Sequence, residues 1–311
     1  MSVIEQVRVE HPVSAKIHRL STASAKRVIE PDTDLPGHIG PGQILPDDLL
    51  SVAGLDLDLS DEQKAKLSRE EVGSITTAGV IFEAVLEAGF ALQITRSQDL
   101  TDPRITFLLH EIGEETRHQR MFIRMLEDLR PTAVHPLDKW SLRAIQRFVL
   151  ARFIQRPALL YTLVLGGEEI PDLIQKKAAE HPGTDPFIQQ VNRYHRQEEA
   201  RHLSFARAVL PEVFADAGKV DRYLVRRVAP IVIGGMFDML VHPGVYETVG
   251  LPGWDTWKAV RASQERITLR HEAVRPVLRA LLDAGALTRG RIPRRWRELC
   301  GVDRMGEPTA A

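Results

Sequence analysis

The motif EETRH at residues 114–118 recurs as EEARH at residues 198–202, so four of five residues are identical at an offset of 84. Each copy lies in a segment that opens with Asp-Pro, at residues 102–103 and 185–186, and repeats apolar residues at spacings of three and four. Apolar residues at that spacing line one face of an α-helix. The sequence therefore predicts two long helices that are copies of one element.

Each motif places a carboxylate and an imidazole on the same side of its helix. Three residues along an α-helix advance by about 300°, so Glu115 lies beside His118, and Glu199 lies beside His202. Carboxylate and imidazole together suit iron or manganese. A single Glu-x-x-His is usually a solvated pair, but two near-identical copies on corresponding helices favour a site for two metal ions.

A dinuclear site of this kind needs one more carboxylate from each of two further helices. The candidates are Glu83 or Glu87 in the first long helical segment, and Glu168 or Glu169 in the third. We choose Glu83 and Glu168, because they precede the motif glutamates of their halves by 32 and 31 residues. Glu87 is one turn from Glu83 and stays open. Glu169 would need a local change of helical register, which the glycines at residues 166–167 permit.

A third imidazole joins the second copy. His195 precedes Glu199 by four residues, so it lies on the face that also carries His202. The equivalent position in the first copy is Glu111, which we assign to the helix surface or to a supporting hydrogen bond rather than to the ligands. The two halves of the predicted site are therefore unequal.

Supporting side chains flank the predicted ligands. Glu114 and Glu198 begin the two motifs and are expected to accept hydrogen bonds from ligand imidazoles, with Arg117 and Arg201 pairing to them. Four buried carboxylates carry a charge of about −4, which two divalent ions cancel. Without metal, several of these carboxyl groups are expected to be protonated or to contact water.

The rest of the chain predicts an all-α protein, a four-helix bundle with additional helices over residues 60–285. An irregular N-terminal arm, residues 1–59, precedes it, because prolines and glycines cluster near its end. A basic tail, residues 286–311, packs on the bundle or extends from it. Ser60 and Gln63 predict a capping box, and Pro157 and Pro171 are expected to kink or split the third long helix. The expected helices cover residues 60–98, 101–129, 139–179, 185–215, 219–241 and 255–285.

Composition excludes several functions. Lys and Arg number 41 against 42 Asp and Glu, a net charge of −1, which supplies no broad attraction for nucleic acid or an anionic membrane. The one cysteine, Cys300, excludes an intrachain disulfide and a cysteine-rich zinc site. Residues 1–10 lack the pattern of a secretory signal, and the apolar stretch 228–241 is shorter than the roughly 20 residues of a membrane span. We expect a cytoplasmic protein with no nucleic-acid or membrane partner.

The paired Glu-Glu-x-Arg-His motifs resemble those of ferritin-like diiron oxygenases. With His195, the chain length and the proline-rich arm, the sequence resembles the p-aminobenzoate N-oxygenase (AurF-type) family in particular, over about residues 60–280. The resemblance implies a ferritin-like bundle, with metal ligands at the matching positions and no catalytic residue beyond them. Those positions are Glu83, Glu115, His118, Glu168, His195, Glu199 and His202.

The same resemblance implies a cofactor and partners. The cofactor is two iron ions, with manganese or a mixed iron and manganese pair as alternatives, and O₂ is the co-substrate. The implied reaction is oxygenation of a small molecule, best known for the amino group of an arylamine. A reductase or ferredoxin would donate electrons, and a homodimer is one option. The alternatives are a diiron hydroxylase or desaturase of an acyl-type substrate, and a non-enzymatic iron-binding ferritin-like protein.

Overall fold

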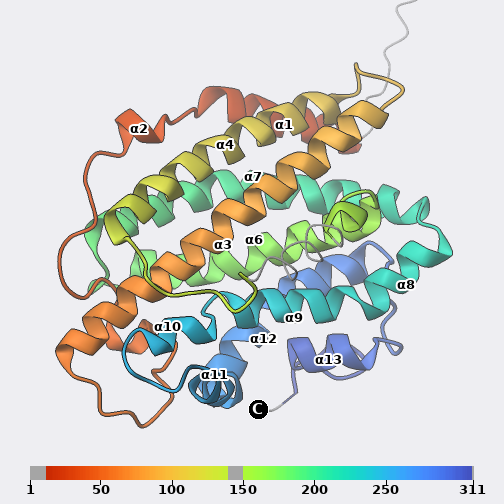
Figure 1. The fold of residues 1–311 in the computed structure, drawn as a ribbon. Coiled ribbons are helices and arrows are strands. Elements are labelled where there is room, and N and C mark those ends of the chain that lie inside the picture. Colours follow the sequence, from red (N-terminus) through yellow and green to blue (C-terminus); the bar gives the residue numbers. More distant parts are fainter. Residues whose placement is uncertain (1–11, 139–149, 310–311) are drawn as a thin grey trace, which may run out of the picture.

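The computed structural model describes residues 12–138 and 150–309, and these residues form an all-α protein (Figure 1). Within the described ranges, the β-type pairing is limited to an isolated bridge between Val302 and Pro308. Four long helices pack as two pairs, α3 against α4 and α6 against α7. Their bounds are Asp61–Arg96 for α3, Pro103–Leu129 for α4, Pro157–Glu180 for α6 and Pro186–Ala215 for α7. The predicted all-α, ferritin-like bundle is confirmed.

The long helices begin where their capping residues stand. The Ser60 hydroxyl accepts a hydrogen bond from the Gln63 N–H, and the Gln63 side chain accepts one from the Ser60 N–H, which confirms the capping box of α3. Asp102 caps α4 and Asp185 caps α7 through their carboxylates. In both helices a proline follows at the first position, where a missing N–H leaves no hydrogen bond unmade.

The third predicted helix splits at one proline and continues through the other. Residues 139–149 of that expected helix lie outside the described residues. The chain leaves the helical conformation before Pro157, and α6 then begins at Pro157, as expected. Pro171, by contrast, lies inside α6 and does not split it.

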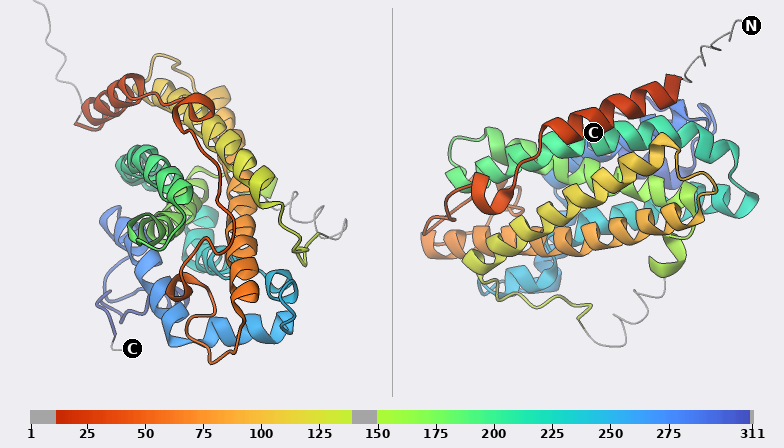
Figure 2. Two further views of the ribbon diagram at one scale, coloured as in Figure 1. Left: turned by 90° about the vertical axis from the view of Figure 1, so that its left-hand side faces the viewer. Right: turned by 90° about the horizontal axis from the view of Figure 1, so that it is seen from above.

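The N-terminal arm is only partly irregular where the structure describes it, so that prediction is wrong for residues 12–26. Residues Pro12–Lys26 form helix α1, and short turns follow at α2, Pro31–Asp34, and η1, Asp47–Leu49. α1 lies along α4 and α7 (Figure 2) and buries Ile17. The segment carries no glycine and no proline after position 12, so nothing in it interrupts a helix. The glycines and prolines that predicted an irregular arm begin only at residue 31.

Additional helices cover the α6 side of the bundle. Each of the two expected helices there is divided in two, at Val228 and at Ser263, the latter accepting a hydrogen bond from the Arg266 N–H. The basic tail packs on the protein through α13, whose Trp296 is fully buried and donates to the Val225 carbonyl. The bounds are Lys219–Arg227 for α8, Ala229–Met239 for α9, Pro243–Glu247 for α10, Gly253–Ala262 for α11, Gln264–Asp283 for α12 and Arg294–Cys300 for α13.

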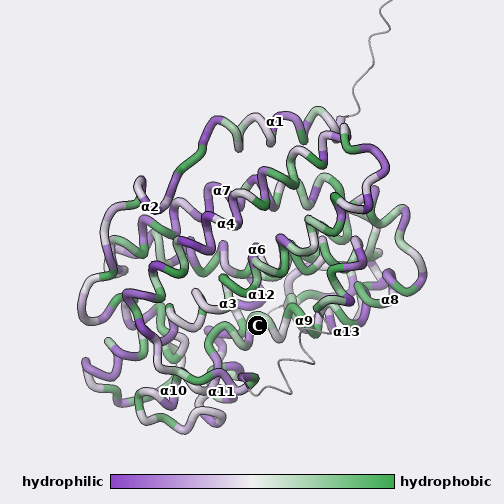
Figure 3. Tube along the Cα trace, turned by 45° about the horizontal axis from the view of Figure 1, so that its top comes forward, coloured by the Kyte–Doolittle hydropathy of each residue, from purple (hydrophilic) through white to green (hydrophobic). Residues whose placement is uncertain are grey.

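The pattern of hydropathy shows where a polar site can sit. α6 and α9 are largely hydrophobic, whereas α4 and α7 mix hydrophobic and strongly hydrophilic residues (Figure 3). Phe107 of α4 stacks on Phe205 of α7 with ring centroids 4.3 Å apart, which anchors these two helices to each other. Their charged residues therefore also face each other inside the bundle.

Among the described helices, α3 has the length and apolar composition that could cross a membrane, and 28% of its apolar window is buried. One such helix is weak evidence for a membrane span, because core helices of soluble proteins have the same length and composition. α3 packs along α4 and buries Glu83.

Candidate metal centre

The four bundle helices bring all seven predicted ligands together in the interior. α3 supplies Glu83, α6 supplies Glu168, and the duplicated helices α4 and α7 supply the rest. None of the seven is more than 3% exposed. They are Glu83, Glu115, His118, Glu168, His195, Glu199 and His202.

Two glutamates each face both motif histidines. His118 Nδ1 lies 2.9 Å from Glu115 Oε2 and 3.2 Å from Glu199 Oε1. His202 Nδ1 lies 3.1 Å from Glu115 Oε1 and 3.2 Å from Glu199 Oε2. Each carboxylate thus presents one oxygen to each imidazole. Two carboxylates placed in this way could hold two metal ions, one beside each histidine.

The other predicted ligands surround the carboxylates of Glu115 and Glu199. His195 Nε2 lies 3.5 Å from Glu83 Oε1 and 3.5 Å from Glu199 Oε1. Glu83, Glu115 and Glu168 place ligand atoms within 4.8 Å of one another. The structure therefore brings Glu83 and Glu168 to the cluster, while their role as ligands stays a prediction.

The two alternatives lie elsewhere. Glu87 is partly exposed and accepts a hydrogen bond from Gln119 at 3.2 Å. Glu169 pairs with Arg207. Each has a protein partner outside the cluster, and Arg207 balances the charge of Glu169.

The glycines at 166–167 allow close packing rather than a change of register. α6 is regular helix through both positions. A Cβ on Gly167 would lie 1.8 Å from the ring carbon Cζ of Phe82, which precedes Glu83 on α3. A Cβ on Gly166 would lie 2.7 Å from Ile233 of α9. Glycine therefore lets α6 approach α3 at the level of Glu83, which brings Glu168 within reach of it.

The ring nitrogens that face away from the cluster are paired crosswise. His118 Nε2 hydrogen-bonds to Glu198 Oε2 at 3.1 Å, and His202 Nε2 hydrogen-bonds to Glu114 Oε2 at 2.7 Å. The expected hydrogen bonds are confirmed, and each connects a histidine to the glutamate of the opposite motif. With Nε2–H donating to a carboxylate, Nδ1 is left to face a metal ion.

Arginines pair with these supporting glutamates. Arg201 donates to Glu114 at 2.7 Å, and Arg117 donates to Glu198 at 3.3 Å. Burial alone would raise the pKa of Glu114, but the hydrogen bonds from His202 and Arg201 lower it to about 2. The predicted arginine pairing is confirmed and is also crosswise, since Arg201 and Glu114 belong to different motifs.

Sequence reasoning missed two supporting residues. Tyr194 donates its hydroxyl to Glu198 at 2.8 Å, and Gln175 lies with its Oε1 2.9 Å from His195 Nδ1. If His195 donates from Nδ1 to Gln175, its Nε2 lone pair faces the cluster. The spacing of four between Tyr194 and Glu198 was a usable signal. Gln175 lies on another helix, α6, and no motif marks it.

The donor atoms fit metal ions because several are buried and unpartnered. A buried carboxylate oxygen without a hydrogen-bond donor is unfavourable in a protein interior, and a cation removes the penalty. Burial, and then the neighbouring carboxylates of Glu115 and Glu199, raise the pKa of Glu83 well above its ordinary value. The atoms without a hydrogen-bond partner include Glu83 Oε2, Glu115 Oε1, Glu168 Oε1, His195 Nε2 and Glu199 Oε1.

Metal binding is predicted to release protons. Burial, and then neighbouring carboxylates, raise the pKa values of Glu83 and Glu168, which favours the protonated form of both groups in the metal-free cluster. A metal ion must displace these protons, so affinity should fall as pH falls. Calorimetric titration with Mn(II) in two buffers of different ionisation enthalpy measures the release. Equal heats in both buffers would contradict the prediction.

Removal of His195 is predicted to weaken one ion without emptying the site. Burial, followed by the neighbouring His118, lowers the pKa of His195 to about 4, so the ring is a neutral donor. His195→Ala should therefore keep bound metal but react with O₂ on a changed time course and give little product. Stopped-flow absorbance and product yield test this, and wild-type values for both would show that His195 only packs.

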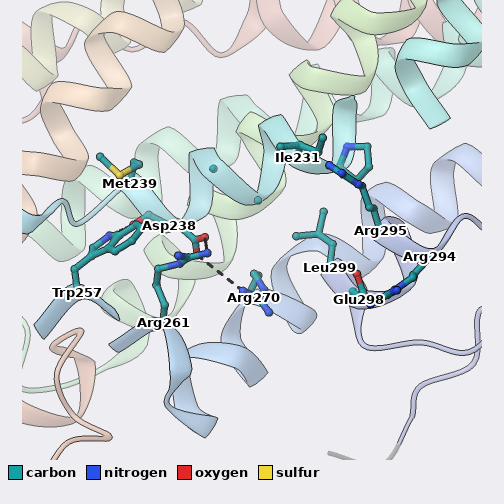
Figure 4. A pocket seen from close by; sticks show the side chains of 13 residues that line it. Ile231, Asp238, Met239, Trp257, Arg261, Arg270, Arg294, Arg295, Glu298 and Leu299 are labelled. Atoms are coloured by element: carbon teal, nitrogen blue, oxygen red, sulfur yellow. Dashed lines mark hydrogen bonds and ion pairs between the residues drawn. The ribbon is translucent and has the colours of Figure 1, made fainter. Parts of the chain in front are cut away.

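A second polar region lies apart from the cluster. A surface groove of about 710 Å³ is lined by residues of α9, α11, α12 and α13 (Figure 4). Arg261 pairs with Asp238 across it at 2.8 Å. None of the seven predicted ligands lines this groove, so it is separate from the candidate metal centre.

The fold and the site together define a ferritin-like helical protein with a buried carboxylate–histidine cluster suited to two metal ions. Residues 11–285 match the family described as p-aminobenzoate N-oxygenase AurF. The chain therefore belongs to this family of oxygenases.

Two proteins from mycobacteria match part of the chain. The uncharacterized proteins Rv0885 of Mycobacterium tuberculosis and Mb0909 of Mycobacterium bovis are each 27% identical over 185 residues, which is 59% of this chain. The matched region spans about half of these relatives, 54% of their length. Among solved structures, a mutant of R2-like ligand-binding oxidase with an anaerobically reconstituted Mn/Fe cofactor is 16% identical, with a TM-score of 0.48 over 91% of this chain and 95% of that one.

Proposed function

We propose that this protein is an O₂-dependent oxidoreductase with a dinuclear iron centre that oxygenates a small organic substrate, the amino group of an arylamine. The observation that carries the proposal is the pair of buried glutamates, Glu115 and Glu199, each facing both His118 and His202. The family description supports the reaction class. Manganese, alone or with iron, uses the same donor types.

The residues of the chain divide the work around such a centre. Two reduced ions supply the electrons that O₂ needs and positions at which it binds. Glu115 and Glu199 would hold both ions, and the crosswise hydrogen bonds from His118 and His202 fix the orientation of the rings. Burial of every predicted ligand keeps bulk water away from the reacting centre.

The purified protein is predicted to bind two iron ions per chain, or one iron and one manganese. Four carboxylates at the centre, Glu83, Glu115, Glu168 and Glu199, balance the charge of two divalent ions. Elemental analysis after anaerobic loading measures the content. Zinc at about one per chain, or no metal after loading, would count against the assignment.

The reaction is tested by anaerobic iron titration followed by exposure to O₂. Absorbance follows the centre, and mass spectrometry follows candidate substrates, with p-aminobenzoate as the first arylamine and a fatty acyl substrate as the competitor. An arylamine product heavier by oxygen from ¹⁸O₂ supports the proposal. A hydroxylated or desaturated acyl product would instead assign the chain to the alternative class.

Two partners follow from the proposed reaction and from α3. Continued turnover needs an electron donor, which we assign to a reductase or ferredoxin.

α3 carries an exposed stripe at helical spacing that includes Ile81, Ala84 and Ala88, with Ile81 53% exposed. Because this stripe is apolar and long, we propose that a second copy of the chain covers it in a homodimer. Light scattering of the purified protein, with Ile81→Glu as the disrupting variant, tests the dimer. The cytoplasmic location stays a prediction.

A further inference from the structure

The duplicated motif makes Glu111 the counterpart of His195. The two residues are 84 positions apart, which is the offset of the motifs. Each precedes its motif glutamate by four residues, which is about one helical turn. α4 and α7 therefore present three side chains in the same order, ending in a glutamate and a histidine.

His195 lies on the side of the cluster that holds His118. Glu83, His118, His195 and Glu199 place ligand atoms within 4.8 Å of one another. The rings of His118 and His195 have centroids 4.3 Å apart. An imidazole from α7 thus joins the donors around an imidazole from α4.

Glu111 makes the matching arrangement on the other side. Ligand atoms of Glu111, Glu115 and His202 all lie within 4.8 Å of one another, and all three residues are buried. Glu111 comes from α4 and His202 from α7. The relation is crosswise, as it is for His195 and His118.

Burial of Glu111 calls for a cation. The residue is 1% exposed, and its Oε2 has no hydrogen-bond partner. The nearby hydroxyl of Tyr161 donates to Gln93 Oε1 at 3.1 Å. A carboxylate that is buried without donors is unfavourable, so the group is either protonated or compensated by a cation, and a metal ion beside His202 would supply that cation. The assignment of Glu111 to the helix surface is therefore wrong, and its supporting role is the alternative that the experiment below tests.

We propose that Glu111 is a ligand of the metal ion beside His202, as the carboxylate counterpart of His195; this rests on the dinuclear centre proposed above. The ion beside His118 then has two imidazole donors. The ion beside His202 has one imidazole and an additional carboxylate. Because carboxylates suit harder ions than imidazoles do, the two positions differ in metal preference, with the His202 position the more favourable for manganese.

Anaerobic Mn(II) titration of Glu111→Gln, with free Mn(II) counted by its EPR signal, tests the assignment. Wild type should bind two ions. Glu111→Gln should keep one ion with wild-type affinity and bind the second more than about 100-fold more weakly, beyond the loss typical of removing a supporting hydrogen-bond partner. Glu169→Gln is the matched control, because Glu169 is also buried but pairs with Arg207, and it should bind both ions.

The outcomes separate this inference from the proposed function. Two ions bound to Glu111→Gln with wild-type affinity would overturn the ligand role and leave the dinuclear centre intact. Fewer than two ions bound to wild type would overturn both.

Two further measurements exclude a folding defect as the cause. The metal-free Glu111→Gln protein should unfold at no lower temperature than metal-free wild type, because an amide replaces an unpartnered buried carboxyl group. Saturating Mn(II) should stabilise the variant less than wild type. A crystal structure of Mn-loaded wild type decides without any substitution: a bond from Glu111 to the ion beside His202 supports the inference, and Glu111 bound to neither ion overturns it.

Discussion

Glu199→Ala and Glu115→Ala are each expected to reduce O₂-dependent turnover by more than about 100-fold, beyond the loss typical of removing a supporting hydrogen-bond partner. Each carboxylate has one oxygen within 3.2 Å of His118 Nδ1 and its other oxygen within 3.2 Å of His202 Nδ1. Removal of either one takes a donor from both ions at once. Single-turnover experiments with the iron-loaded protein measure the loss.

The helical fold should survive both substitutions. The bundle is held by large clusters of buried apolar residues on either side of the site. Circular dichroism checks the fold. Glu212→Ala is the control, since Glu212 lies on α7 with Glu199 but is exposed at the surface and pairs with Arg104. Wild-type turnover in Glu115→Ala and Glu199→Ala would contradict the proposed metal site.

Glu83→Ala is expected to lose tight binding of at least one metal ion, whereas Glu87→Ala should bind metal as wild type does. Glu83 is 3% exposed and lies beside His195, Glu115 and Glu168. Glu87 is one turn further along α3, partly exposed, and paired with Gln119. Anaerobic iron titration of the two variants in parallel measures the difference.

The two α3 variants act as controls for each other, because they remove the same group from the same helix. A loss of metal confined to Glu87→Ala would show that the choice of Glu83 is wrong. The same comparison on α6, between Glu168→Ala and Glu169→Ala, checks the other added carboxylate. Glu169 is expected to affect only its ion pair with Arg207.

Local features of the chain were predictable because they depend on neighbours in sequence. Ser60 and Gln63 cap α3 as a capping box, and the Asp-Pro pairs at 102–103 and 185–186 open α4 and α7. The sequence analysis did not predict helix α1. The irregular arm was expected from glycines and prolines that begin only at residue 31, after α1 has ended. The splits at Val228 and Ser263 were also missed, since apolar spacing continues across both.

The class of site was predictable from residue spacing within each helix. Helical periodicity fixes which residues of one helix share a face, so Glu115 with His118 and Glu199 with His202 follow from spacing alone. The duplication at an offset of 84 then indicates two equivalent helices and a dinuclear centre.

How these faces meet depends on the packing of the helices against one another. Periodicity within a helix carries no information on the rotation and sliding of one helix against another. The crosswise bonds of His118 to Glu198 and of His202 to Glu114 therefore had to be read from the packed bundle. The same holds for Gln175 beside His195, on a different helix. Close contact at Gly167 brings α6 to α3, and this packing between helices, rather than any motif, places Glu83 and Glu168 in one cluster.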